Sequence, residues 1–233
     1  MNYLVFLATL FAVCATAEAM PKATQLQNAV DLWGPATPEQ LQCLKDSGYA
    51  KVIFCAFDIH HGDGQLDKYV LENTRSAQKA DLDVEYYMLP LIPSQKTGAE
   101  QFKVVYDGLA SGGFTMKFLW IQVMNKYYFH RDQAENVALI NDMVAAAKQH
   151  NVGTGVYTTE RDWNEITNGT SIDNLELWYV HTKPIGHPTA PDFSDFSPFA
   201  NFKTPQMKQY SQSEWICNAL VDRDVYRDEP RNN

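Results

Sequence analysis

The stretch Phe118-Leu119-Trp120-Ile121-Gln122-Val123-Met124-Asn125 decides the fold that this sequence predicts. It is apolar and follows Gly112-Gly113, a pattern typical of a fully buried strand in a parallel sheet. Side chains alternate along a strand, so Trp120, Gln122 and Met124 face the same way. In an α/β barrel, sites are built at the carboxyl ends of the strands. The sequence therefore predicts a site at the end of this stretch.

The two side chains at the polar end of this strand, Gln122 and Met124, cannot act as a catalytic acid or base. Gln122 carries an amide whose charge does not change near neutral pH, and Met124 offers only a thioether. This pair favours a binding surface over a catalytic centre. The alternative interpretation is that both side chains only fill the core at a strand end.

Strands and helices alternate on both sides of this stretch. Thr37 with Gln40, and Thr97 with Glu100, have the spacing of capping boxes at helix starts. Residues 181–204 contain four prolines and little periodicity, so we expect a long surface loop with at most one helical turn there. Strands are expected at 28–33, 50–57, 84–89, 118–125, 153–157, 175–179, 206–210 and 220–226, and helices at 37–48, 66–79, 97–113, 137–147 and from 159.

This order of elements predicts an α/β fold, a TIM-like (β/α) barrel with fewer helices in the last third. Of the 233 residues, 45% are hydrophobic and 20% are charged, which suits one large domain. We therefore expect a single barrel domain over residues 20–233.

The N-terminal segment predicts export from the cell. Residues 3–13 form an apolar run that is too short for a good membrane span, and small residues follow it up to Ala17 and Ala19. Although it lacks a basic start, this pattern predicts a signal peptide over residues 1–19 and a secreted, extracellular protein. No later stretch approaches the roughly 18 apolar residues that a membrane helix needs, so no membrane association is expected.

The formal net charge of -9 argues against nucleic acid as a partner, because nucleic-acid binding relies on basic surfaces. We expect a monomer. The other four histidines show no metal-ligand spacing with the adjacent pair His60-His61, which lies in a glycine-rich loop and is expected to be solvated.

Three cysteines follow the predicted signal peptide, an odd number for an oxidising compartment. One disulfide and one free thiol are the simplest outcome. A bridge between Cys43 and Cys217 would tie the two chain ends together, as barrel closure favours, and Cys55 is expected to be buried and inert in an apolar strand. Asn168-Gly169-Thr170 is a glycosylation sequon in a turn-like setting.

Several further segments carry a resemblance to a known family, and they occur in that family's order between Ala29 and Tyr226. They are Ala29-Val30-Asp31, Cys43-Leu44-Lys45-Asp46-Ser47-Gly48-Tyr49, Gly155-Val156-Tyr157-Thr158 followed by Trp163, Leu177-Trp178-Tyr179, Lys208-Gln209-Tyr210 and Val221-Asp222. The sequence resembles the family 25 glycoside hydrolases, which are secreted lysozymes (muramidases), and most of all the branch found in nematodes and amoebae.

The resemblance implies a barrel with an acidic groove at the strand ends, no metal or cofactor, and cleavage of the peptidoglycan backbone in antibacterial defence or digestion. The family signature is Asp-x-Glu at the end of the fourth strand. Here Gln122 stands in place of the aspartate and Met124 in place of the acidic glutamate. By family position, Asp31 and Asp222 stay in the groove, and Glu85 on the third strand could face it.

Glycoside cleavage needs one carboxylic acid for the leaving oxygen and usually a second carboxylate. Loss of both signature carboxylates therefore predicts little or no activity. A relocated acid is the alternative, with Asp31 and Asp222 as candidates for a site role and structural or surface roles expected for the others. The carboxylates considered are Asp31, Glu85, Glu160, Asp222 and Asp224.

Four aromatic residues at predicted strand ends are candidates for stacking on sugar rings, with core packing as the alternative for each: Tyr87, Tyr157, Trp178 and Tyr210. Three hypotheses follow. The first is a lysozyme-like glycan-binding protein with little or no activity. The second is an active muramidase with a relocated acid. The third is a non-catalytic scaffold that binds a protein through its acidic surface or the 181–204 loop.

Overall fold

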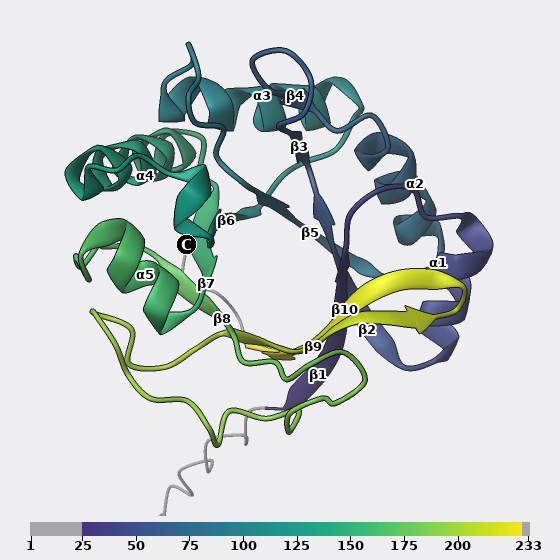
Figure 1. The fold of residues 1–233 in the computed structure, drawn as a ribbon. Coiled ribbons are helices and arrows are strands. Elements are labelled where there is room, and N and C mark those ends of the chain that lie inside the picture. The colour runs from purple at the N-terminus through teal and green to yellow at the C-terminus, as the bar shows by residue number, and fades with distance from the viewer. Residues whose placement is uncertain (1–24, 230–233) are drawn as a thin grey trace, which may run out of the picture.

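The computed structural model describes residues 25–229, so the predicted signal peptide lies outside the described residues. Within this range the strands close a barrel in the order β1-β10-β9-β8-β7-β6-β5-β2 (Figure 1). The barrel strands are β1 Leu26–Leu32, β2 Tyr49–Cys55, β5 Asp83–Met88, β6 Phe118–Val123, β7 Gly153–Thr158, β8 Glu176–Val180, β9 Met207–Ile216 and β10 Ala219–Arg227. Strand β10 is antiparallel to both of its neighbours, and the other strands pair in parallel.

The helices surround the barrel on its outer side (Figure 1). They are α1 Pro38–Asp46, α2 Val70–Lys79, α3 Gly98–Ser111, α4 Gln133–Gln149 and α5 Glu160–Thr167, with a short 3-10 helix, η1, at Lys126–Tyr128. Both predicted capping boxes are present, at Thr37 with Gln40 and at Thr97 with Glu100. In the described chain no helix follows β8, so the predicted barrel with few helices in its last third is confirmed.

Two predicted elements differ from the structure. The helix expected from residue 66 begins at Val70, because β4 (Gln65–Leu66) instead pairs with β3 (Phe57–Asp58). The strand expected at 206–210 continues to Ile216 and turns into β10 through Cys217 and Asn218, whose φ angles are 54° and 59°. Two residues with positive φ are typical of a hairpin turn, and such a turn makes the next strand antiparallel.

The barrel interior is packed with aromatic rings. Trp120 from β6 and Trp178 from β8 are fully buried there, with ring centroids 5.7 Å apart. Trp120 lies against the backbone of β7, where a Cβ added to Gly155 would approach its Cζ3 atom to 2.3 Å. The glycine therefore makes room for the indole. A second apolar cluster fills the space between the barrel and the helices.

The Cys43–Cys217 disulfide is confirmed and joins α1 to the turn between β9 and β10. Gln40 strengthens this attachment, because its Nε2 donates to the Asn218 carbonyl at 2.6 Å. Cys55 is a free, partly buried thiol on the inner side of β2. Burial raises the pKa of Cys55 to about 12. None of the helices between residues 25 and 229 is long and apolar enough to cross a membrane.

Candidate functional site

Carboxylates from two strands meet in the mouth of the barrel, at the carboxyl ends of the parallel strands. Asp31 comes from β1 and Asp222 from β10, and the two are Cα partners in the antiparallel pair. The Nε2 atom of Gln209 on β9 lies 2.9 Å from Asp31 Oδ2, 3.0 Å from Asp222 Oδ2 and 2.7 Å from the Tyr157 hydroxyl. The Gln209 amide nitrogen carries two protons, so the three acceptor oxygens share two donor hydrogens. Gln209 thus links β1, β7, β9 and β10 across the mouth.

A third carboxyl, Asp224, lies deeper in the barrel below this pair. It is fully buried, and its Oδ1 accepts a hydrogen bond of 2.8 Å from Trp178 Nε1. Its Oδ2 makes no hydrogen bond to another group in the described chain, although Asp31 and Asp222 lie close enough for their charges to act on this carboxyl.

The electrostatics of this cluster favour protonation. Burial, and then the charge of Asp222, raise the pKa of Asp31 well above its ordinary value. Burial raises the pKa of Asp224 in the same way, with the charges of Asp31 and Asp222 adding to it. The pKa of Asp222 is also raised by burial. The cluster is therefore a set of carboxyls that keeps a proton at a pH where exposed aspartates have lost theirs.

Replacement of Asp224 by asparagine is expected to stabilise the protein at neutral pH. The folded protein binds the proton of this raised-pKa group more tightly than the unfolded chain does. Protonated Asp224 thus stabilises the folded protein at low pH. This stabilisation is lost as the pH rises from the pKa of an aspartate in the unfolded chain, near 4, through the raised pKa of Asp224 in the folded protein. In Asp224→Asn, the amide oxygen can still accept from Trp178 Nε1, and the side chain stays neutral at every pH.

Thermal unfolding at pH 4 and pH 7 tests this expectation. We expect Asp224→Asn to raise the Tm at pH 7 by about 2–4 °C, the shift that about 1 kcal/mol produces in a domain of this size. The difference between the Tm at pH 4 and the Tm at pH 7 should be smaller in the variant than in the wild type. Asp173→Asn, which changes an exposed carboxylate, is the control and should leave both values unchanged. An equal loss of Tm at both pH values in Asp224→Asn would contradict the raised pKa of Asp224.

A hollow of about 490 Å³ opens beside the end of β6 and is lined by Gln122 and Met124. Gln122 is the register partner of Tyr157, so it faces the mouth next to the Gln209 linkage. Among residues 25–229 the Gln122 side chain makes no hydrogen bond to another group, which leaves its amide available to a ligand. On η1, Tyr127 is 87% exposed and, with Tyr128, forms the rim of this hollow.

Most of the predicted stacking residues are core residues. Tyr157 stacks on Trp178 with ring centroids 4.0 Å apart, and Tyr87 meets both rings edge-on. Trp178 is fully buried and presents no face to the mouth. Tyr210 is also buried, on the outer side of β9, where the Arg223 guanidinium lies 4.9 Å from its ring centroid. Because Met207 and Gln209 point inward, alternation turns Tyr210 away from the mouth.

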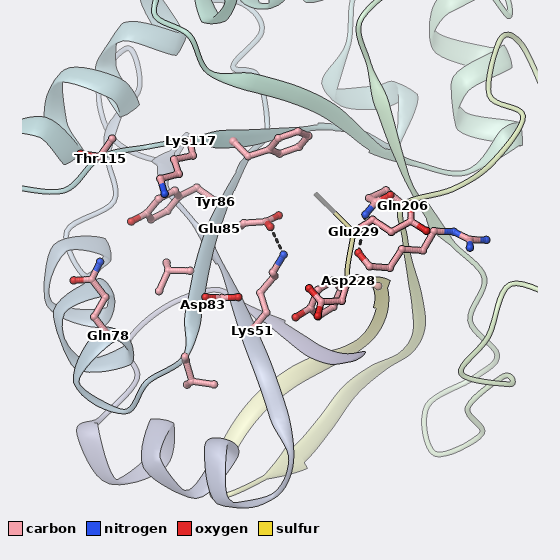
Figure 2. Close-up of a pocket in the computed structure, with 15 residues that line it drawn as sticks. Lys51, Gln78, Asp83, Glu85, Tyr86, Thr115, Lys117, Gln206, Asp228 and Glu229 are labelled. Atoms are coloured by element: carbon pink, nitrogen blue, oxygen red, sulfur yellow. Dashed lines mark hydrogen bonds and ion pairs between the residues drawn. The ribbon is translucent and has the colours of Figure 1, made fainter. Parts of the chain in front are cut away.

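The structure separates the remaining carboxylates from this cluster. Glu85 lies at the opposite, amino-terminal end of the barrel, where it pairs with Lys51 and accepts a bond of 2.7 Å from Trp120 Nε1. Figure 2 shows this ion pair in a pocket of about 500 Å³. The sequence interpretation that Glu85 could face the groove is therefore wrong, because Glu85 stands near the start of β5. Glu160 is exposed in the first turn of α5.

Sequence reasoning did not select Gln209 as a site residue and expected a structural or surface role for Asp224. The available signal was the alternation that places Asp222 and Asp224 on one face of a strand. Exposed Trp33 and Trp215 were also missed, because nothing local distinguishes them from core tryptophans. Between residues 25 and 229, no group of three or more His, Cys, Asp or Glu side chains is arranged to hold a metal ion.

Comparison with known proteins gives consistent matches. A family model described as Lysozyme-like protein 1 matches residues 22–210. Lysozyme-like protein 2 of Caenorhabditis elegans is 37% identical over 203 residues, covering 85% of this chain and 72% of that protein. Probable GH family 25 lysozyme 2 of Dictyostelium discoideum is 30% identical over 228 residues, covering 97% and 100%. The solved GH25 lysozyme from Aspergillus fumigatus shares the fold, with a TM-score of 0.66, 19% identity, and coverage of 88% and 95%.

Proposed function

Since this chain belongs to the lysozyme-like proteins of glycoside hydrolase family 25, we propose that it is a secreted protein that binds peptidoglycan glycan with little or no hydrolysis. The family's barrel is a peptidoglycan-hydrolysing glycosidase fold. The role that fits this proposal is antibacterial defence or the digestion of bacteria.

One observation carries the proposal: the two side chains at the end of β6 are an amide and a thioether. By the family resemblance this is where the Asp-x-Glu pair acts, and Gln122 and Met124 line the hollow at that place. Proton transfer by a positioned acid typically contributes about 100- to 10,000-fold to a rate, and electrostatic stabilisation can contribute as much. A site without both groups keeps little of that acceleration.

Glycan binding does not need those carboxylates. The Gln122 amide can donate to and accept from sugar hydroxyls, and the Asp31 and Asp222 carboxyls can accept from them. These groups face one mouth. A concave site with a few convergent polar groups is typical of small-ligand binding.

The test is one incubation of the purified, full-length secreted protein with insoluble bacterial peptidoglycan. We expect the protein to pellet with the peptidoglycan and to release no reducing ends above a buffer control. Release at the rate of an intact family member would overturn the loss of activity. Neither pelleting nor release would favour a protein-binding scaffold instead.

A second candidate function is an active muramidase with a relocated acid, and the observation that favours it is the cluster of Asp31, Asp222 and Asp224, in which burial raises the pKa of each carboxyl. Two features weigh against it. Asp224 is fully buried and has no access to a glycosidic oxygen, and Asp31 Oδ2 accepts from Gln209. If this candidate were correct, Asp31→Asn would abolish the release of reducing ends.

Secretion and glycosylation belong to the same proposal. Asn168 is exposed at the end of α5, in a left-handed conformation with φ of 56°, so a glycosyltransferase could reach it. The mass of protein recovered from the culture medium tests both expectations: the chain should begin after Ala17 or Ala19, and enzymatic deglycosylation should lower its mass. A full-length N-terminus without a glycan would contradict them.

A further inference from the structure

The hairpin of β9 and β10 continues past the carboxylates, away from the barrel. Its outer part is anchored, because the Ser213 backbone N–H donates to Asp222 Oδ1 at 2.6 Å and the Cys43–Cys217 disulfide ties the turn to α1. Two large apolar side chains lie exposed on this rigid extension. Trp215 is 75% exposed and Leu220 is 51% exposed, and they are direct Cα partners across the hairpin.

These side chains lie on the face of the sheet that carries the carboxylates. Along β10, Asp224, Asp222 and Leu220 alternate to one side, and Trp215 shares that side as the partner of Leu220. On the neighbouring strand, Asp31 pairs with Asp222. Two residues beyond Asp31 the chain has just left β1, which ends at Leu32.

That position is Trp33, which is 61% exposed. Its ring lies against His60 with centroids 5.4 Å apart, which holds the indole beside the end of β1. Continuing the antiparallel register of β1 and β10 from Asp31 and Asp222 brings Trp33 toward Leu220. Leu220 and Trp215 are thus partners across the hairpin, and Trp33 stands just beyond the end of the adjoining strand β1. We name these three side chains the hairpin platform.

We propose that the hairpin platform is a glycan subsite on which sugar rings of a peptidoglycan strand stack where the strand leaves the barrel mouth. The inference rests on the proposed function and locates its ligand. The rings of Tyr157 and Trp178 are buried inside the barrel, whereas the platform supplies exposed ring faces at the edge of the mouth. A pyranose ring has a face of C–H groups that packs on an indole, while its hydroxyls stay in water at the sides.

The surroundings favour a neutral sugar strand over other occupants. Asp31, Asp222 and Glu214 lie on or beside the same strands, and the chain has a net charge of -9, so an anionic surface is disfavoured. A stable interface with a second copy of the chain would need a larger contact area than the platform offers. Three partly exposed side chains of at most about 250 Å² each fall short of the roughly 800 Å² per partner that a stable interface buries.

The test measures depletion of the full-length protein by rising amounts of insoluble peptidoglycan. Trp215→Ala is expected to weaken binding about fivefold, and Trp33→Ala/Trp215→Ala about 25-fold, if each ring contributes as an aromatic contact does and the two add. Trp215→Phe retains a ring and should recover most of the binding. Ile185→Ala, which removes an exposed apolar side chain in the 181–204 loop, is the matched control and should bind as the wild type does.

The outcomes separate this inference from the proposed function. If the wild type pellets and both tryptophan variants pellet equally well, the platform is wrong and the proposed function stands. If the wild type does not pellet, both fall. Sedimentation in solution covers the remaining occupant: a wild-type dimer that Trp215→Ala converts to a monomer would assign the platform to a second copy. Equal Tm values across the variants establish that the exposed substitutions leave the fold intact.

Discussion

The Gln122→Asp/Met124→Glu double variant is expected to release reducing ends from peptidoglycan at least about 100-fold faster than the wild type, the lower end of what a positioned proton donor contributes. The double change supplies the two carboxyls that glycoside cleavage uses, one to protonate the leaving oxygen and one to stabilise the charge that develops on the sugar. The wild type has an amide and a thioether at these positions.

The surroundings of β6 can accept both carboxyls. Gln122 and Met124 line a hollow of about 490 Å³ and are only partly buried, so charged groups there keep contact with water. Gln122 is the partner of Tyr157, whose hydroxyl accepts from Gln209. The new groups would thus face the mouth next to the linkage that holds Asp31 and Asp222 in place.

The neutral double variant Gln122→Asn/Met124→Gln is the matched control, because it has the same shapes without the carboxyls. It should stay inactive and still pellet with peptidoglycan. Reducing-end release is measured together with the Tm of each variant. A double carboxyl variant that folds and pellets but releases nothing would contradict the expectation that these two carboxyls are enough to give hydrolysis.

Removal of the Cys43–Cys217 bridge is expected to lower the free energy of unfolding by about 2–5 kcal/mol. The bridge closes a loop across a sequence separation of 174 residues, so it restricts the unfolded chain strongly. In the folded protein it holds the β9–β10 turn against α1. For a domain of this size, about 4 kcal/mol corresponds to a Tm lowered by about 8–16 °C.

Urea unfolding of Cys43→Ser/Cys217→Ser against the wild type measures this effect. Cys55→Ala is the control, because it removes a cysteine that forms no disulfide and should cost about 1 kcal/mol, the usual effect of a single substitution. An equal loss in both variants would mean that the bridge contributes nothing beyond the packing of its sulfur atoms. The double serine variant should also bind peptidoglycan more weakly, because Trp215 stands two residues before Cys217.

Local and periodic features of the chain were predictable from the sequence. The capping boxes at Thr37 and Thr97 depend only on residues three apart, so helix starts there need no distant partner. Likewise, the residues from Phe118 to Val123 form a strand that is buried along almost its whole length, as their apolar character predicts. The alternation of strands and helices predicted the barrel, and the positions of Cys43 on a helix and Cys217 near the C-terminus predicted the disulfide.

The sequence by itself thus determined the order of the elements, the barrel and the presence of an amide and a thioether, Gln122 and Met124, at the end of β6. Only the tertiary structure decided which end and which face each side chain occupies. Glu85 faces Lys51 at the far end, Tyr210 lies outside the barrel, and Trp215 is exposed beyond the mouth. The reason is that alternation along a strand defines two faces without saying which one points inward. In addition, the irregular register between β9 and β10 changes which residues share a face.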